Sequence, residues 1–355
     1  MRARDSCRML RGSTSRRRPV LSLALAFSWV ISPARATQPR KTNTLQSYLN
    51  VLVANQRGSA IVINPATGQI LAAWNLESAV RDAYPPGSAA KIVEAAAALE
   101  EGVLVPGDRI VCRGVPPLLG ASYRCAHPPA REGLTLRPAL ANSCNYFFAA
   151  VSLRLSAEAL LHWYSVFGFG SAQTLDGNPT GPGRVARASG ARSKALEAVG
   201  AQDVLATAAQ LLEAYCLIAN RGSAPRLWTD APPLSSSAPE RQITLRPVTY
   251  ASILGGLVDC VRSGTCQAAA VRGVEVAGKT GTATAGDGSG ATHAWFAGFA
   301  PAEHPRIALV IFLDRGTGAH SAAPLAGRLL RHFFAVQQDR RDSVYGQWNR
   351  ASNAR

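Results

Sequence analysis

The sequence predicts an α+β fold of three layers, in which one antiparallel sheet is flanked by helices and carries an inserted all-helical subdomain. Residues 59–75 read as a β-hairpin, because two apolar runs flank Pro-Ala-Thr-Gly. Three strand-like segments lie near the other end, at 274–284, 293–301 and 306–314. The region between, about 110–222, has mainly helical periodicity with Gly/Pro-rich interruptions. The simplest assembly is one sheet built from both ends of the chain, with a cleft between sheet and insert.

Helical periodicity predicts the elements that cover this sheet. Residues 44–56 precede the hairpin, the alanine-rich segment 88–102 follows it, and 249–262 and 321–336 flank the late strands. The tail 338–355 is polar and is expected to be mobile.

The first residues read as an export signal. In residues 1–36 an Arg-rich segment precedes a 12-residue apolar run at 20–31. That run is shorter than the roughly 20 residues that span a bilayer. Ala-Arg-Ala at 34–36 predicts cleavage, and an uncleaved leader would anchor the chain instead. We therefore expect a linker at 37–43 and one stand-alone domain at 44–337, exported to a periplasmic or other extracytoplasmic space.

Charge argues against a nucleic-acid partner. The net charge is +16, but the leader contributes eight Arg and one Asp, which is +7. The remaining charge is spread along the chain without a recognition motif. A modestly basic surface favours anionic cell-envelope polymers or a membrane surface.

Exported chains retain disulfides, so the cysteines are candidates for pairing. Outside the leader they are Cys112, Cys125, Cys144, Cys216, Cys260 and Cys266. Cys112 with Cys125, across a Pro/Gly-rich loop, and Cys260 with Cys266 are possible pairs, and free buried thiols are the alternative. Neither spacing resembles a metal site, so neither metal nor cofactor is expected.

One serine and one lysine stand together in the alanine-rich helix. Of 38 basic residues only four are lysines: Lys41, Lys91, Lys194 and Lys279. Arginine keeps its proton in proteins, whereas a buried lysine can lose one. Ser88 and Lys91 lie three residues apart, on one helix face, where a lysine of lowered pKa would activate the hydroxyl. The alternative is a capping serine followed by a surface lysine.

Two further motifs carry polar groups in apolar surroundings. Ser-Cys-Asn at 143–145 begins a strongly apolar helix, where capping is the alternative role. Lys-Thr-Gly at 279–281 lies in a strand of small residues, along which a ligand backbone fits. Its amine and hydroxyl suit a carboxylate, and a solvent-facing lysine is the alternative.

The three motifs together resemble the signature of penicillin-binding proteins and class A β-lactamases. Their order matches, with 55 residues from Ser88 to Ser143 and 136 from Ser143 to Lys279. The resemblance covers about residues 45 to 336. It implies a β-lactamase/transpeptidase-like fold and a serine D,D-transpeptidase or D,D-carboxypeptidase. The implied partners are peptidoglycan stem peptides, with β-lactams as covalent inhibitors.

The resemblance also implies residue roles. Ser88 would attack the penultimate D-Ala carbonyl, and Lys91, alone or jointly with Ser143, would accept its proton. Ser143 would relay a proton to the leaving D-alanine, and Asn145 would bind the substrate and hold Lys91.

The strand supplies the remaining groups. Lys279 and Thr280 would bind the terminal carboxylate, while Gly281 keeps the strand open. The backbone N–H groups of Ser88 and Thr282 would form the oxyanion hole.

Two alternatives remain from the sequence. A serine β-lactamase must also hydrolyse its acyl-enzyme. Class A enzymes use a glutamate for this, and Glu158 and Glu197 are not convincingly spaced; class D enzymes, the nearer comparison, carry Ser-x-Val instead of Ser-x-Asn. The other alternative is a non-catalytic sensor of β-lactams or muropeptides, although no transmembrane signalling part is visible.

Overall fold

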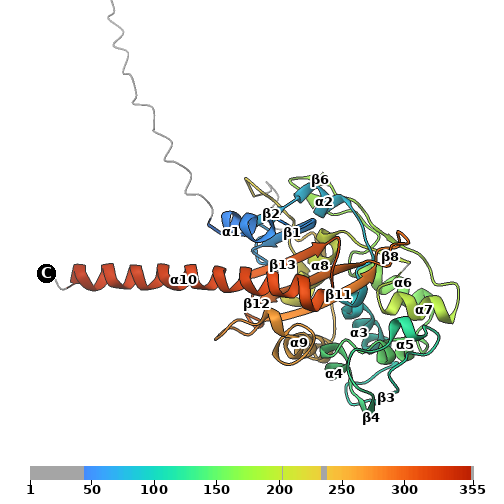
Figure 1. Ribbon diagram of the computed structural model, residues 1–355. Helices are drawn as coiled ribbons and strands as arrows, with labels where there is room; N and C mark the ends of the chain where they lie inside the picture. Colours follow the sequence, from blue (N-terminus) through green and yellow to red (C-terminus); the bar gives the residue numbers. More distant parts are fainter. Residues whose placement is uncertain (1–43, 202, 233–237, 353–355) are drawn as a thin grey trace, which may run out of the picture. The chain divides into compact units, whose positions relative to one another are not determined.

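A computed structural model describes residues 44–201, 203–232 and 238–352. Its centre is a five-stranded antiparallel sheet of order β11-β12-β13-β1-β2 (Figure 1). The strands are β1 (Gly58–Ile63), β2 (Ile70–Trp74), β11 (Ala277–Thr284), β12 (Thr292–Ala300) and β13 (Ile307–Leu313). The prediction of one antiparallel sheet from both ends of the chain is therefore confirmed.

Strand alternation divides the core into two layers, because successive side chains point to opposite faces. In β1, Ala60 and Val62 pack with the helices α1 and α10, whereas Ile61 and Ile63 pack with α8. All 12 residues of α8 are buried, which places this helix at the centre of the molecule's apolar core.

Helices supply the outer layers and most of the inserted region. In Figure 1 the green helices α4, α5 and α7 group together beside α3. The helices are α1 (Thr44–Val53), α2 (Leu76–Arg81), α3 (Lys91–Glu100), α4 (Leu136–Ala141), α5 (Asn145–Ser152), α6 (Ala157–Val166), α7 (Ala191–Ala198), α8 (Ala208–Ala219), α9 (Pro247–Arg262) and α10 (Ala323–Ser352).

The inserted region was predicted to be all-helical, and this prediction is wrong in part. Its Gly/Pro-rich interruptions form short paired strands. Each pair holds a loop between helices by a few backbone hydrogen bonds. The pairs are β3 (Ile110–Cys112) with β4 (Ala130–Leu134), β5 (Thr174–Leu175) with β6 (Asn178–Pro179), and β7 (Arg184–Val185) with β8 (Val204–Leu205). A further pair, β9 (Ser223–Ala224) with β10 (Arg241–Gln242), follows α8.

The two ends of the chain complete the comparison with the predicted domain organisation. The predicted signal peptide at 1–36 and linker at 37–43 lie outside the described residues. Where the sequence predicted a mobile tail from 338, the structure continues α10 to Ser352. Within the described ranges, none of the helices combines the length and the apolar character needed to cross a bilayer.

Two buried carboxyl groups lie on α3 and on α7 of the inserted region. Glu94 on α3 and Glu197 on α7 are both 0% exposed, and among the described residues their carboxyl oxygens have no hydrogen-bond partner. Burial raises the pKa of Glu94 well above its ordinary value, and that of Glu197 to about 8, with Asp203 adding to the second effect. Since burial disfavours the charged form, Glu197 is mainly protonated at neutral pH.

Replacing Glu197 with Gln should make stability less dependent on pH. The raised folded-state pKa means that the folded protein holds a proton which the unfolded chain releases near pH 4.5. This contribution to stability is full below about pH 4.5 and is lost as the pH rises towards 8. At pH 5, Glu197→Gln should have the melting temperature of the wild type. At pH 9 its melting temperature should be higher, by about 2 °C for each kcal/mol of unfolding free energy that it gains over the wild type.

Thermal unfolding at pH 5, 7 and 9 measures this effect, with Glu132→Gln on exposed β4 as the matched control. An equal melting-temperature difference between Glu197→Gln and wild type at all three pH values would contradict the assignment.

Candidate active site

Ser88 lies in a tight turn in front of the alanine-rich helix. The turn is the 3₁₀ helix η1 (Gly87–Ala90), and α3 begins only at Lys91. The sequence predicted a helix from residue 88, whereas Ser88 lies in this 3₁₀ turn and precedes the α-helix by one turn. Its side chain is half-buried, while Gly87, Ala89 and Ala90 beside it are buried. Ser88 is therefore the one partly exposed residue of an otherwise buried turn.

The turn with Ser88 touches the edge strand of the sheet, and glycines permit the contact. Gly87 has a φ of 55°, and a Cβ there would lie 2.7 Å from the carbonyl oxygen of Thr282. A Cβ on Gly281 would lie 2.2 Å from the carbonyl oxygen of Pro86. Larger side chains at either position would separate the serine turn from β11, so both glycines set the distance between Ser88 and the strand.

Lys91 joins the first motif to the second. Its Nζ donates hydrogen bonds to Asn145 Oδ1 at 2.6 Å and to the Ser143 carbonyl oxygen at 2.9 Å. It also lies 3.4 Å from Ser143 Oγ. Lys91 is 0% exposed, and its burial lowers its pKa to about 8, against the opposing charges of Cys144, Cys125 and Glu94. Near neutral pH the amine is therefore close to losing its proton.

The Ser143 backbone is held in an unusual conformation. Its φ is 55°, in the left-handed region, and its N–H donates to the Leu140 carbonyl oxygen at 3.2 Å. Cys144 then caps α5, because its Sγ accepts the N–H of Phe147. Asn145 follows as the first residue of α5, and its Nδ2 donates to the Tyr123 carbonyl oxygen at 3.0 Å. The turn thereby directs both the hydroxyl and the amide towards Lys91.

The third motif lies on β11, at the edge of the sheet. Lys279 is 0% exposed, and its Nζ donates to the Thr280 carbonyl oxygen at 3.2 Å. Burial, and then the charge of Lys91, lower its pKa well below the ordinary value. Two amines within electrostatic reach of each other favour the binding of an anion between or beside them.

The two threonines of this strand have partners that the sequence did not identify. Thr280 Oγ1 lies 2.8 Å from Thr265 Oγ1, and Thr282 Oγ1 accepts the Gly318 N–H at 3.0 Å. Thr280 is buried, whereas Thr282 is exposed. No spacing in the sequence relates these partners to the motif, because they come from separate elements that meet only in the folded sheet.

The structure thus brings all eight predicted site residues together at the β11 edge of the sheet. The Ser88 turn is in contact with β11, and Lys91 is hydrogen-bonded to the 143–145 turn. Lys279 interacts with Lys91 through their charges. Thr280 and Thr282 lie on the same strand with their hydroxyls directed to other elements. A hydroxyl, a neutralisable amine and strand N–H groups together can perform acyl transfer.

The cysteines differ from the prediction in one pair. Cys260 and Cys266 form a disulfide, but Cys112 and Cys125 are free thiols whose sulfurs are 3.7 Å apart. Cys144 lies 3.8 Å from Cys125. No metal ligands were predicted here, yet Cys112, Cys125, Cys144 and His127 place four potential ligand atoms within 4.8 Å of one another. The fold brings them together across loops, which their spacing does not reveal.

Neither glutamate considered for deacylation is placed as a general base. Glu158 is exposed and pairs with Arg187. Glu197 is buried, and its raised pKa of about 8 keeps it mainly protonated at neutral pH. A protonated acid cannot activate water by accepting a proton.

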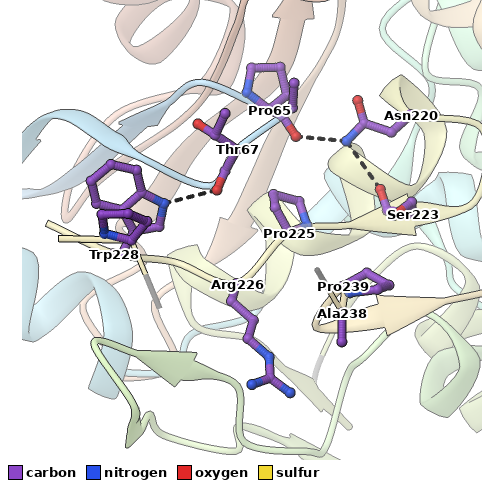
Figure 2. A pocket seen from close by; sticks show the side chains of 11 residues that line it. Pro65, Thr67, Asn220, Ser223, Pro225, Arg226, Trp228, Ala238 and Pro239 are labelled. Atoms are coloured by element: carbon purple, nitrogen blue, oxygen red, sulfur yellow. Dashed lines mark hydrogen bonds between the residues drawn. The ribbon is translucent and has the colours of Figure 1, made fainter. Parts of the chain in front are cut away.

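A separate pocket lies beside the β1–β2 turn (Figure 2). Asn220 Nδ2 donates to the carbonyl oxygens of Pro65 and Ser223, and Trp228 Nε1 donates to that of Thr67. These side chains hold the hairpin turn against the segment after α8. Because the lining includes no residue of the three motifs, the pocket is distinct from the site around Ser88.

The known proteins most relevant to this chain by sequence similarity include two peptidoglycan D,D-transpeptidases. The chain is 28% identical over 326 residues to peptidoglycan D,D-transpeptidase PbpA of Mycolicibacterium smegmatis, covering 76% of this chain and 65% of that protein. It is 26% identical over 344 residues to peptidoglycan D,D-transpeptidase MrdA of Acinetobacter baumannii, covering 79% and 51%. The chain therefore spans less than two thirds of these relatives' length.

Solved structures and a family model also relate this chain to penicillin-binding proteins. Pseudomonas aeruginosa PBP2, solved in complex with WCK 5153, has 26% identity and a TM-score of 0.71, with 82% of this chain and 76% of that chain covered. The transpeptidase domain of Burkholderia pseudomallei penicillin-binding protein 3 shares the fold, at 24% identity and a TM-score of 0.70, with 82% and 92% covered. The family model described as the penicillin binding protein transpeptidase domain matches residues 58–331. The chain belongs to the penicillin-binding protein transpeptidase family.

Proposed function

We propose that this chain is an exported serine D,D-transpeptidase or D,D-carboxypeptidase. Its substrate is the D-Ala-D-Ala end of a peptidoglycan stem peptide, and penicillins acylate the same serine. The observation that carries the proposal is the buried Lys91, which binds Asn145 and Ser143 one helical turn from Ser88. Its lowered pKa, beside the Ser143 hydroxyl, is typical of a residue that transfers protons.

The reaction proceeds through an acyl-enzyme. Ser88 Oγ attacks the carbonyl carbon of the penultimate D-Ala, and its proton passes to neutral Lys91, directly or with Ser143. The bond to the terminal D-Ala then breaks, and Ser143 delivers the proton to the leaving amine. An acceptor amine or water next attacks the ester and releases Ser88.

Binding groups come from the strand. Lys279 would attract the terminal carboxylate, whose negative charge would raise the lysine's pKa and restore its proton. The contact of Gly87 with Thr282 supports an oxyanion hole formed by the N–H groups of Ser88 and Thr282. In other serine enzymes, losing one such donor costs about 2.7–4 kcal/mol of transition-state stabilisation.

Labelling with a fluorescent penicillin tests the nucleophile. The full chain should form a stable covalent adduct, and Ser88→Ala should form none, because the attacking oxygen is absent. Ser189→Ala, an exposed serine elsewhere, serves as the control. Both the appearance of label and its decay are followed on gels.

Each outcome separates the proposal from its alternatives. Label that disappears within seconds while the drug is consumed would instead establish a β-lactamase. A folded wild-type chain without any adduct would rule out acylation of Ser88 and leave a non-catalytic sensor.

The acylation rate should depend on the protonation of Lys91. Only the neutral amine accepts the Ser88 proton, so the rate should increase with pH and reach half its maximum near pH 8. Lys91→Arg cannot lose its proton and should react about 10²- to 10⁴-fold more slowly. Stopped-flow acylation between pH 6 and 10 measures both effects.

Lys194→Arg is the matched control, because Lys194 donates to the Leu155 carbonyl oxygen away from the motifs. A Lys91→Arg variant with the wild-type rate and pH profile would assign the proton transfer to another group.

A further inference from the structure

Three thiols and one imidazole converge beside the second motif. Cys112 ends β3, Cys125 and His127 lie in the loop before β4, and Cys144 caps α5. The three cysteines are 1%, 7% and 0% exposed. We propose that Cys112, Cys125, His127 and Cys144 bind one zinc ion.

The distances between donor atoms agree with a tetrahedral site. The sulfurs of Cys112 and Cys125 are 3.7 Å apart, and those of Cys125 and Cys144 are 3.8 Å apart. A zinc–sulfur bond of about 2.3 Å gives a sulfur–sulfur edge of about 3.8 Å in a tetrahedron. A disulfide would require a separation of about 2.05 Å. All four donor atoms lie within 4.8 Å of one another, as a single shared ion requires.

The histidine is oriented as a ligand. His127 Nδ1 lies 2.7 Å from the Pro128 carbonyl oxygen, to which it donates, so the lone pair resides on Nε2. Nε2 is buried and has no hydrogen-bond partner among the described residues. An imidazole fixed by a carbonyl through one nitrogen commonly binds a metal with the other. This observation is independent of the thiols and accounts for an otherwise unsatisfied nitrogen.

Backbone N–H groups support all three sulfurs as thiolates. Each sulfur accepts one N–H at a donor–sulfur distance of 3.4 Å. The donors are Gly114 for Cys112, Tyr146 for Cys125 and Phe147 for Cys144. Hydrogen bonds to a charged acceptor are stronger than those to a neutral one, and such outer contacts tune metal-bound thiolates.

The donor set selects the metal and its role. Three thiolates with one imidazole suit zinc, whereas carboxylate and carbonyl oxygens suit magnesium or calcium. Four protein ligands fill a tetrahedral shell and leave no position for substrate, so the ion is structural. It would join the β3–β4 loop to the first turn of α5.

The proposed zinc site is connected to Lys91 through Asn145. Asn145 directly follows Cys144, and its Nδ2 donates to the carbonyl oxygen of Tyr123, two residues before Cys125. Its Oδ1 accepts from Lys91. The ion would therefore act as a positioning element for Asn145, and this second step rests on the proposed acylation of Ser88.

Metal content of the purified full chain tests the site without reference to activity. Chain isolated without chelators should contain one zinc per molecule by mass spectrometry of the metal. Replacement by Co²⁺ should give the visible absorption of a tetrahedral ion and sulfur-to-cobalt charge transfer in the near ultraviolet. Cys112→Ser and His127→Ala should lose both signals, whereas Cys216→Ser should keep them, because Cys216 is a buried thiol outside the cluster.

Circular dichroism identifies any variant that fails to fold, and wild-type cobalt spectra remain informative in that case. The acylation of Cys112→Ser by penicillin should also be at least about 10-fold slower than that of the wild type. Metal binding without acylation would retain the site and reject the proposed function. A metal-free wild type, a Cys112–Cys125 or Cys125–Cys144 disulfide in peptide mapping, or undiminished zinc in both variants would overturn the site.

Discussion

The hydrogen bonds of one buried amine organise the site. Lys91 has no solvent exposure, so its Nζ must find its partners within the protein. The turn at 143–145 provides them through a main-chain carbonyl, a hydroxyl and an amide oxygen. A buried cation that lost these acceptors would destabilise the fold, so α3 and α5 are bound to a fixed separation. The geometry of the candidate site and the stability of the fold therefore depend on the same contacts.

The sheet provides the rigid frame on which these helices rest. β11 is its edge strand, and the serine turn packs along that edge instead of another strand. An edge strand has free backbone groups, with which an extended peptide can pair. The central helix α8, buried along its length, supports the serine turn directly, because its Tyr215 hydroxyl donates to the Ala89 carbonyl oxygen at 3.0 Å.

Much of this arrangement could be predicted from the sequence, for identifiable reasons. The five strands follow from apolar runs with clear turn signals, and the three motifs stand out as polar groups in apolar segments. The 3₁₀ turn at Ser88 could not be predicted, because it differs from an α-helical start by the spacing of one hydrogen bond. The thiol–imidazole cluster and the Thr265–Thr280 contact depend on loops whose course is set by tertiary packing.

The close contact between Gly87 and β11 also restricts how this sequence can vary. The Gly87 N–H donates a hydrogen bond to the Gly200 carbonyl oxygen. A Cβ on Gly200 would lie 2.1 Å from the Gly87 carbonyl oxygen. With Gly281 on the other side, three glycines surround the serine turn, and none has room for even an alanine. Side-chain size is therefore restricted at these three positions by backbone atoms that cannot move apart without opening the turn. Exposed neighbours such as Thr282 are not restricted in this way, because a new side chain there meets solvent.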